Sequence, residues 1–227
     1  MLLGPEAVKR LQACRVAIFG IGGVGGYVCE ALARAGVGTL DLIDHDTVSL
    51  SNLNRQIIAT HETVGRYKTE VMRERILSIN PQATVNTFNE FFLPENADAF
   101  PFDQYDYIAD AVDTVSAKIA LVLRAREGGI PIISSMGTGN KLYPELLKVT
   151  DIYQTRVCPL ARVMRQELRK RGVDSLKVVC SEEQPRVPVQ SETAESGKPV
   201  PGSISFVPPV AGLLMAGEIV RDLTGQS

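Results

Sequence analysis

The stretch that decides the fold is RVAIFGIGGVGG, residues 15–26. Its first part, residues 15–20, is a short apolar run with β-branched residues, which is typical of a buried parallel strand. A cluster of glycines follows, and residues 27–35 read as a helix. A glycine-rich turn between a strand and a helix can hold phosphate, because the free N–H groups and the positive end of the helix face the anion there.

The same alternation continues beyond this unit. A repeated strand–helix–strand order implies a mostly parallel sheet with helices on both faces. The predicted fold is therefore α/β, a Rossmann-like doubly wound sheet, with residues 1–150 as its nucleotide-binding core. Further strands are expected at 39–44, 84–88, 105–112, 130–135 and 146–152, with helices at 67–79 and 114–127.

Residues 151–227 are expected to form a C-terminal extension of the same domain. Within it we predict a helix at 159–171 and a strand at 175–180. Residues 181–202 are rich in Pro, Ser and Glu, so we expect a mobile loop that could serve as a substrate lid. The apolar residues 203–224 are predicted to form a strand and then a helix, packed on the core or on a second subunit.

Composition excludes several classes of protein. The chain has 227 residues, of which 44% are hydrophobic, and a formal net charge of -2, so we expect one large domain with only a local site for polyanions. Residues 1–10 lack the apolar core of a signal peptide, and the longest uncharged stretch, 199–217, carries four prolines. We therefore expect a cytoplasmic protein without membrane contact. No two of the four cysteines have CxxC spacing, so no structural zinc site is expected.

The glycine turn fits the motif GxGxxG. Gly20, Gly22 and Gly25 occupy its three glycine positions, and Gly23 lies between them. Asp44 ends the second predicted strand 19 residues after Gly25, where a carboxylate would accept a ribose hydroxyl. Up to this point the pattern fits a dinucleotide as well as ATP.

Polar residues beyond Asp44 distinguish the two ligands. The carboxyl ends of parallel strands share one crevice, so side chains that follow different strands can converge there. A pyrophosphate needs little beyond the glycine turn, whereas two extra cations and a carboxylate suit a triphosphate with magnesium. The alternatives are that the cations are solvated, that the asparagines cap helices, and that the last aspartate caps the helix at 114–127. The residues concerned are Asp46, Asn52, Asn54, Arg55, Gln56, Lys68 and Asp113.

Several segments resemble a known family. GIGGVGG (20–26) and DHDTVSLSNLNRQ (44–56), with Lys68 and Asp113, resemble the ubiquitin-activating-enzyme-like (ThiF/MoeB-like) superfamily, whose members adenylate a carboxylate with ATP. LLGPEAVKRL, CPLARVMRQELRKRG and GSISFVPPVAGLLMAGEIVRDL look like the bacterial tRNA threonylcarbamoyladenosine dehydratases within it. The resemblance covers essentially the whole chain.

The resemblance implies a reaction and a role for each matching residue. It implies ATP-dependent adenylation and cyclising dehydration of threonylcarbamoyladenosine in the anticodon stem-loop of tRNA, by a homodimer. A monovalent cation and a sulfur-transfer partner are two further hypotheses that the sequence leaves open. Asp44 would bind the ATP ribose and Asp113 would hold Mg²⁺. Phosphate contacts would come from Asn52, Arg55, Gln56 and Lys68, and catalysis from Arg55, Lys68 and Asp113.

The helix predicted at 159–171 combines two faces. Leu160, Val163, Met164 and Leu168 recur at helical spacing and are expected to face the core. Basic residues on and beside the helix form a local patch that suits a tRNA backbone, although a merely solvated face is the simpler alternative. The basic residues are Arg156, Arg162, Arg165, Arg169, Lys170 and Arg171.

Other functions remain open from the residues alone. Adenylation of the C-terminal glycine of a ubiquitin-like sulfur-carrier protein is one, although the missing CxxC pairs argue against it. An NAD-dependent oxidoreductase fits the glycine turn but leaves Arg55, Lys68 and Asp113 unexplained, and a non-catalytic nucleotide-binding module is a further alternative. Cys158 could accept an acyl group, but ring closure within one side chain has an effective molarity of about 10⁵ M or more, so a structural role is expected.

Overall fold

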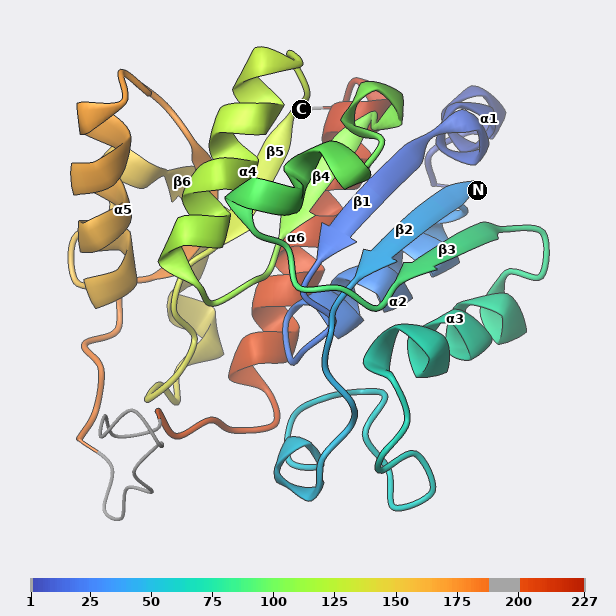
Figure 1. The fold of residues 1–227 in the computed structure, drawn as a ribbon, viewed down its shortest axis with the longest axis horizontal. Coiled ribbons are helices and arrows are strands. Elements are labelled where there is room, and N and C mark those ends of the chain that lie inside the picture. The colour runs from blue at the N-terminus through green and yellow to red at the C-terminus, as the bar shows by residue number, and fades with distance from the viewer. Residues whose placement is uncertain (1, 188–200, 227) are drawn as a thin grey trace.

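Seven strands form one sheet with the opening stretch at its centre (Figure 1). The computed structural model describes residues 2–187 and 201–226. The order of the strands across the sheet is β3-β2-β1-β4-β5-β7-β6. In chain order the strands are β1 (Arg15–Phe19), β2 (Thr39–Ile43), β3 (Thr84–Phe88), β4 (Tyr107–Asp110), β5 (Ile132–Ser135), β6 (Leu147–Asp151) and β7 (Lys177–Ser181).

The direction and order of the strands confirm the predicted Rossmann-like topology. All neighbouring strands are parallel except β6, which runs antiparallel to β7 at the edge of the sheet. The chain runs outward from β1 to β3 and then returns to β4 on the other side of β1. This reversal creates a crevice at the carboxyl ends of the strands, where proteins of this architecture bind ligands.

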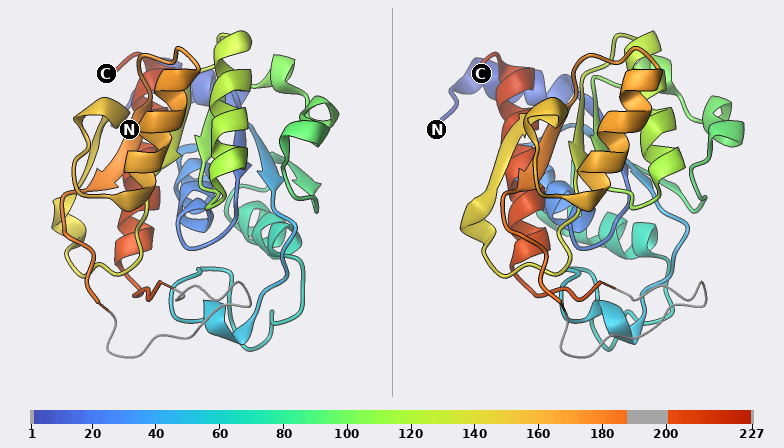
Figure 2. Two further views of the ribbon diagram at one scale, coloured as in Figure 1. Left: turned by 60° about the vertical axis from the view of Figure 1, so that its left-hand side comes forward. Right: turned by 90° about the vertical axis from the view of Figure 1, so that its left-hand side faces the viewer.

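Helices cover both faces of the sheet, as predicted. They are α1 (Pro5–Ala13), α2 (Gly25–Ala35), α3 (Lys68–Ile79), α4 (Val115–Glu127), α5 (Pro159–Lys170) and α6 (Val207–Thr224). The right-hand view of Figure 2 shows α6 on one side of the sheet and α4 with α5 on the other. Helices α2 and α3 share the face of α6. None of the described helices is long and apolar enough to cross a membrane.

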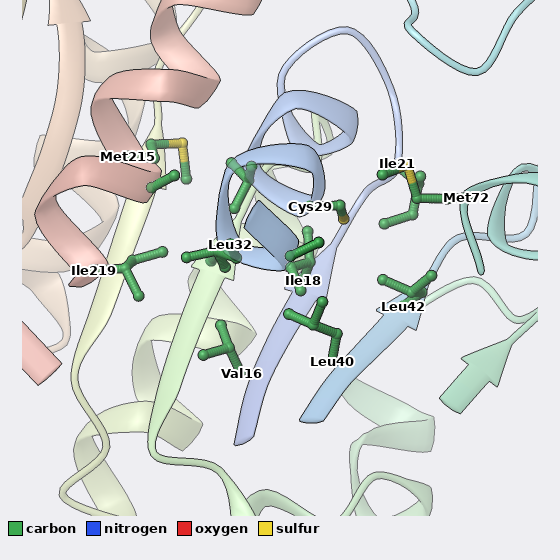
Figure 3. Close-up of a cluster of buried hydrophobic side chains, with 14 of the residues drawn as sticks. Val16, Ile18, Ile21, Cys29, Leu32, Leu40, Leu42, Met72, Met215 and Ile219 are labelled. Atoms are coloured by element: carbon green, nitrogen blue, oxygen red, sulfur yellow. The ribbon is translucent and has the colours of Figure 1, made fainter. Parts of the chain in front are cut away.

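Strand β1 is buried on both of its faces, which explains its unbroken apolar sequence. Val16 and Ile18 point toward α2 and α6, where Leu32 and Met215 pack on them (Figure 3). The alternate residue Phe19 lies in a second cluster on the opposite face, as the two-residue period of a strand requires. A strand covered by helices on both sides has no polar face, so its sequence shows no alternation.

The strand predicted at the start of 203–224 is wrong. Residues 201–206 are irregular and α6 begins directly at Val207. The carbonyl of Ser203 accepts a hydrogen bond from the Asn54 side chain at 2.9 Å instead of pairing with a strand. Pro208 and Pro209 lie in the first turn of α6, where a missing N–H leaves no hydrogen bond unmade.

The predicted mobile loop at 181–202 is only partly described. Ser181 is the last residue of β7, which corrects the start of the loop, and residues 188–200 lie outside the described part of the chain. Glu183 is 6% exposed, and its carboxylate accepts the backbone N–H groups of Leu142 and Tyr143 at 3.0 and 2.9 Å. The beginning of the predicted loop is therefore fixed by hydrogen bonds.

Helix α1 was not predicted.

A buried ion pair lies just below the carboxyl edge of the sheet. Asp110 ends β4, and the Nζ atom of Lys118 in α4 donates to both of its carboxylate oxygens at 3.0 Å. Both side chains are fully buried. Ser134 of β5 also donates to Asp110, so the pair ties β4, β5 and α4 together.

Candidate nucleotide-binding site

A cavity of about 430 Å³ opens at the carboxyl edge of the sheet. It collects most of the residues that the sequence singled out, from segments that follow β1, β2 and β4. Gly25 and Asn54 are the two predicted nucleotide-binding residues that do not line it. Those that do line it are Gly20, Gly22, Gly23, Asp44, Asp46, Asn52, Arg55, Gln56, Lys68 and Asp113.

Two of the glycines are required by close packing of the backbone. Gly20 has φ +89°, and a Cβ atom there would lie 2.7 Å from the Ala111 carbonyl oxygen. A Cβ on Gly25 would lie 1.8 Å from the Gly20 carbonyl oxygen. Gly25 is therefore the residue that lets α2 start directly against the turn, and its effect on a ligand acts through the position of that helix.

Asp44 fastens the end of β2 to the glycine turn. Its carboxylate accepts the backbone N–H of Ile21 at 2.7 Å and that of Asp46 at 2.9 Å. Each oxygen of a carboxylate has two lone pairs, so Asp44 keeps acceptor capacity for ribose hydroxyls. The same side chain thus shapes the turn and faces the cavity.

The two predicted catalytic cations differ in their partners. Lys68 is 6% exposed, and its Nζ atom lies 2.6 Å from Asp46 Oδ2. Arg55 donates to the Ser51 carbonyl and to Asn54 Oδ1 at 3.0 and 2.9 Å, and it pairs with no carboxylate of the described chain. Burial lowers the pKa of Arg55, but an arginine side chain stays protonated. A cation without a carboxylate partner is well suited to a phosphate.

The amide side chains of the loop have distinct roles. Asn52 Oδ1 accepts the Ser49 N–H at 3.1 Å and caps the short 3-10 helix Leu50–Asn52, which is the alternative considered for it. Gln56 is 6% exposed, and its Oε1 atom has no hydrogen-bond partner among the described residues. An unpaired buried amide oxygen is costly, so Gln56 is ready to accept a hydrogen bond from a ligand or a water.

Asp113 is an exposed carboxylate at the rim of the cavity. Among the described residues, its carboxylate accepts one hydrogen bond, from the Thr114 hydroxyl at 3.3 Å. Helix α4 begins at Val115 with Thr114 as its N-cap residue and without a side-chain cap, so the capping alternative for Asp113 is wrong. Carboxylate oxygens are the ligands that Mg²⁺ prefers, and this carboxylate fits that ion.

A second group of ligand atoms was not predicted as a cation site. One ligand atom each of Asp44, His45 and Asp46 lies within 4.8 Å of the others. Asp46 already contacts Lys68 and lies 3.1 Å from His45 Nε2, so its charge is largely balanced by neighbours. Asp113 has fewer contacts than Asp46, so its carboxylate is more available to a metal ion.

Helix α5 presents its basic residues at two separate ends. Near its start, Arg156 and Arg162 are exposed and line a shared surface hollow with Gln166 and Gln184. Neither arginine forms an ion pair within the described chain. The other basic residues are held by neighbours: Arg165 donates to Thr155, Arg169 lies over the Tyr153 ring, and Lys170 and Arg171 both pair with Glu167.

Cys158 is buried beside Cys180 and does not line the cavity. The two thiols are 2% and 4% exposed. A hydrogen bond from Cys180 lowers the pKa of Cys158 to about 5, against the effect of burial, and the N–H groups of Ala161 and Gly137 assist. The same bond, with burial, raises the pKa of Cys180. Cys158 thus lies outside the cavity lining, and its structural role stays a prediction.

Part of the wall of the cavity was not predicted from the sequence. Phe91 and Phe92 follow β3, and Thr138 and Gly139 follow β5, so the carboxyl-edge argument that found Asp44 and Asp113 could have indicated them. Pro201, Ser203 and Pro208 also line the cavity. Nothing in the local sequence shows that this late segment returns to the glycine turn.

The fold and this cavity define a nucleotide-binding α/β protein of the Rossmann-like class. Its elements are a glycine turn at the start of a helix, a carboxylate at the end of β2 and two cations that line the same cavity. The chain belongs to the ThiF family, whose profile matches residues 1–227.

Comparison with known proteins narrows the group within that family. The tRNA threonylcarbamoyladenosine dehydratase of Bacillus subtilis is 40% identical over 233 residues, covering 98% of this chain and 92% of the relative. The crystal structure of the Escherichia coli tRNA N6-threonylcarbamoyladenosine dehydratase with AMP superimposes with a TM-score of 0.90 and 32% identity, covering 99% of this chain and 92% of that one. The structure of the same enzyme with ATP gives 0.89, with 32% identity and coverage of 99% and 91%.

Proposed function

We propose that the protein is an ATP-dependent tRNA threonylcarbamoyladenosine dehydratase. It activates the carboxylate of the threonylcarbamoyl group as an acyl adenylate and closes it into a ring with net loss of water. The observation that carries the proposal is the cavity itself, where the glycine turn, Asp44, Arg55, Lys68 and Asp113 face one space. Relatives that match nearly the whole chain bear this name.

The side chains divide the work of adenylation between them. The glycine turn and the start of α2 hold phosphate, and Asp44 holds the ribose. The substrate carboxylate attacks the α-phosphate and pyrophosphate leaves, while Arg55 and Lys68 stabilise the charge that develops on phosphoryl oxygens. Asp113 is the residue that would hold Mg²⁺, which when bound neutralises phosphate charge.

Ring closure needs no nucleophile from the protein. The acyl carbon of the adenylate is attacked by an atom of the same threonylcarbamoyl group, the attacking atom loses its proton, and AMP leaves with the oxygen that bonded it. An intramolecular reaction of this kind is fast once its geometry is fixed. The burial of Cys158 outside the cavity lining supports a route without an acyl-enzyme.

The reaction is tested by incubating the protein with Mg-ATP and tRNA that carries threonylcarbamoyladenosine, then weighing the nucleosides by mass spectrometry. We expect an ATP-dependent loss of one water from the modified nucleoside. AMP formation only when a carrier protein with a C-terminal glycine is added would favour that acceptor instead. Preferential binding of NAD over ATP would support an NAD-dependent oxidoreductase. ATP binding without any turnover would support a non-catalytic nucleotide-binding module.

We further propose that tRNA binds at the start of α5. Cys158 Sγ lies 3.6 Å from the Cβ position of Gly137, next to Thr138 in the cavity wall, so this end of α5 lies at the carboxyl edge. Arg156 and Arg162 are there and form no ion pair in the described chain; Glu182 lies near enough to interact with Arg156 but pairs with Lys148. Both arginines are therefore available to phosphates. The opposite end, with Lys170 and Arg171, is neutralised in part by Glu167.

Two double variants with the same change in charge test this placement. Arg156→Glu with Arg162→Glu is expected to weaken tRNA affinity at least about tenfold near physiological salt and to lower the salt slope by about two. Lys170→Glu with Arg171→Glu is expected to change affinity much less. Filter binding of tRNA over a series of salt concentrations gives both quantities, and equal losses for the two variants would contradict the placement.

We also propose that the enzyme is a cytoplasmic homodimer. Three leucines are partly exposed on one part of the surface. Leu142 and Leu146 lie in the segment just before β6, and Leu213 lies on α6, which contacts that segment; their exposed fractions are 38%, 38% and 48%. An apolar surface of this kind suits a second copy of the chain. Sedimentation velocity is expected to give a dimer, and a monomer at micromolar concentration would contradict it.

A further inference from the structure

Asn140 has an unusual backbone conformation in the turn between β5 and β6. Its φ is +58°, and it is the one residue other than glycine with positive φ in the described chain. Asparagine tolerates this left-handed conformation better than most residues, yet the conformation still costs free energy relative to the ordinary regions. Such a conformation persists where surrounding interactions hold it.

Three hydrogen bonds hold Asn140. Its backbone N–H donates to the Gly202 carbonyl at 2.7 Å, and its carbonyl accepts the Arg186 N–H at 2.8 Å. Its side-chain Oδ1 accepts the Gly202 N–H at 2.7 Å. One residue therefore joins the segment that contains Arg186 to the segment that contains Gly202.

These bonds fix part of the cavity wall. Pro201 and Ser203, on either side of Gly202, line the cavity, as does Gly139 next to Asn140. A Cβ atom on Gly139 would lie 2.8 Å from Pro201 Cβ, so the two segments are in close contact.

The wall is also connected to a catalytic cation. The Ser203 carbonyl accepts a hydrogen bond from Asn54 Nδ2 at 2.9 Å, and Asn54 Oδ1 accepts one from Arg55 at 2.9 Å. A series of hydrogen bonds thus runs from Gly202 and its neighbour to the guanidinium. Asn54, which does not line the cavity itself, acts on the site by this route.

The wall lies on the side of the cavity where the acyl group must enter. Asp44, at the end of β2, marks the ribose side, and Asp113 follows β4. Thr138 and Gly139 follow β5, one strand farther from the ribose side. We propose that Asn140 is a positioning residue that sets the Pro201–Ser203 wall for the carboxylate of the tRNA substrate. This inference rests on the proposed dehydratase function.

A matched pair of variants isolates the side chain of Asn140. Asn140→Gly keeps the left-handed backbone without strain and removes the acceptor, while Asn140→Asp keeps an acceptor. For Asn140→Gly we expect KM for the tRNA substrate to rise about fivefold, the effect of one lost hydrogen bond, with KM for ATP within about twofold. Asn140→Asp is expected to restore KM for tRNA.

Amide exchange of Gly202 provides a readout that does not depend on turnover. The Gly202 N–H is expected to exchange faster in Asn140→Gly than in the wild type or in Asn140→Asp. An active wild type with equal KM for tRNA in all three proteins would overturn the proposal, as would equal rises in both KM values. A wild type that binds ATP but does not dehydrate the tRNA would instead overturn the proposed function and the substrate assigned to this wall.

Discussion

Replacing Asp113 by Asn is expected to lower kcat at least about a hundredfold, the usual effect of removing one group that stabilises the charge of a transition state. Asp113 is exposed at the rim of the cavity, and within the described part of the chain its carboxylate accepts a hydrogen bond from the Thr114 hydroxyl alone. It carries no cap and no ion pair in the described chain and lines the cavity, so its carboxylate is available to a ligand there. The amide keeps the shape of the side chain and removes the charge that a divalent cation requires.

The dependence of turnover on magnesium concentration separates a metal role from other roles of Asp113. We expect the variant to need far more Mg²⁺ for half-maximal rate, while ATP binding without metal stays near the wild-type value. Asp103→Asn changes an exposed aspartate outside the cavity and is expected to behave as wild type. An unchanged magnesium profile for Asp113→Asn would contradict the metal role.

Lys118→Met is expected to destabilise the protein by about 3–5 kcal/mol, because it leaves a buried carboxylate without its counter-charge. Lys118 and Asp110 are both fully buried, and Nζ lies 3.0 Å from each carboxylate oxygen. Only two neutral donors, the Ser134 hydroxyl and the Val112 N–H, would then compensate the charge of Asp110 among the described residues. Thermal unfolding followed by circular dichroism measures the loss.

Two control variants define the cause of that loss. Lys118→Met combined with Asp110→Asn removes both charges and is expected to be less destabilised than the single variant. Lys148→Met breaks a solvent-exposed pair with Glu182 and is expected to leave Tm unchanged. A single variant of Lys118 as stable as the wild type would show that the buried pair does not hold β4 and α4 together.

The fold could be predicted where the pattern is local. The apolar run of β1, the glycine turn and the start of α2 follow each other without interruption, and each is specified by its own residues. The strand expected before α6 failed because the Ser203 carbonyl is taken by Asn54, a partner far away in the sequence. Helix α1 was not predicted, although its sequence has helical signals: Pro5 lies in the first turn, and Val8 and Leu11 recur at helical spacing among charged residues.

Site residues that directly follow a strand could be predicted from the sequence. Those in a segment far away in the sequence that folds back onto the cavity could not. Asp44 and Asp113 come directly after β2 and β4, so topology alone places them at one edge. Pro201 and Ser203 reach the same cavity through their contacts with Gly139 and Asn54, which local patterns do not encode. Lys170 and Arg171 differ from Arg156 and Arg162 because Glu167 forms ion pairs with them. The spacing of Glu167 to these two residues on one helix already allows such pairs, so this difference could have been predicted.

The fate of a heavy-oxygen label tests the central claim most directly. The carboxylate of the threonylcarbamoyl group is labelled in the tRNA substrate, and AMP is weighed after a single turnover. Adenylation followed by ring closure transfers one carboxylate oxygen to AMP, so we expect labelled AMP together with the dehydrated nucleoside. Dehydrated nucleoside with unlabelled AMP would show that the carboxylate is not adenylated and would contradict the proposed chemistry.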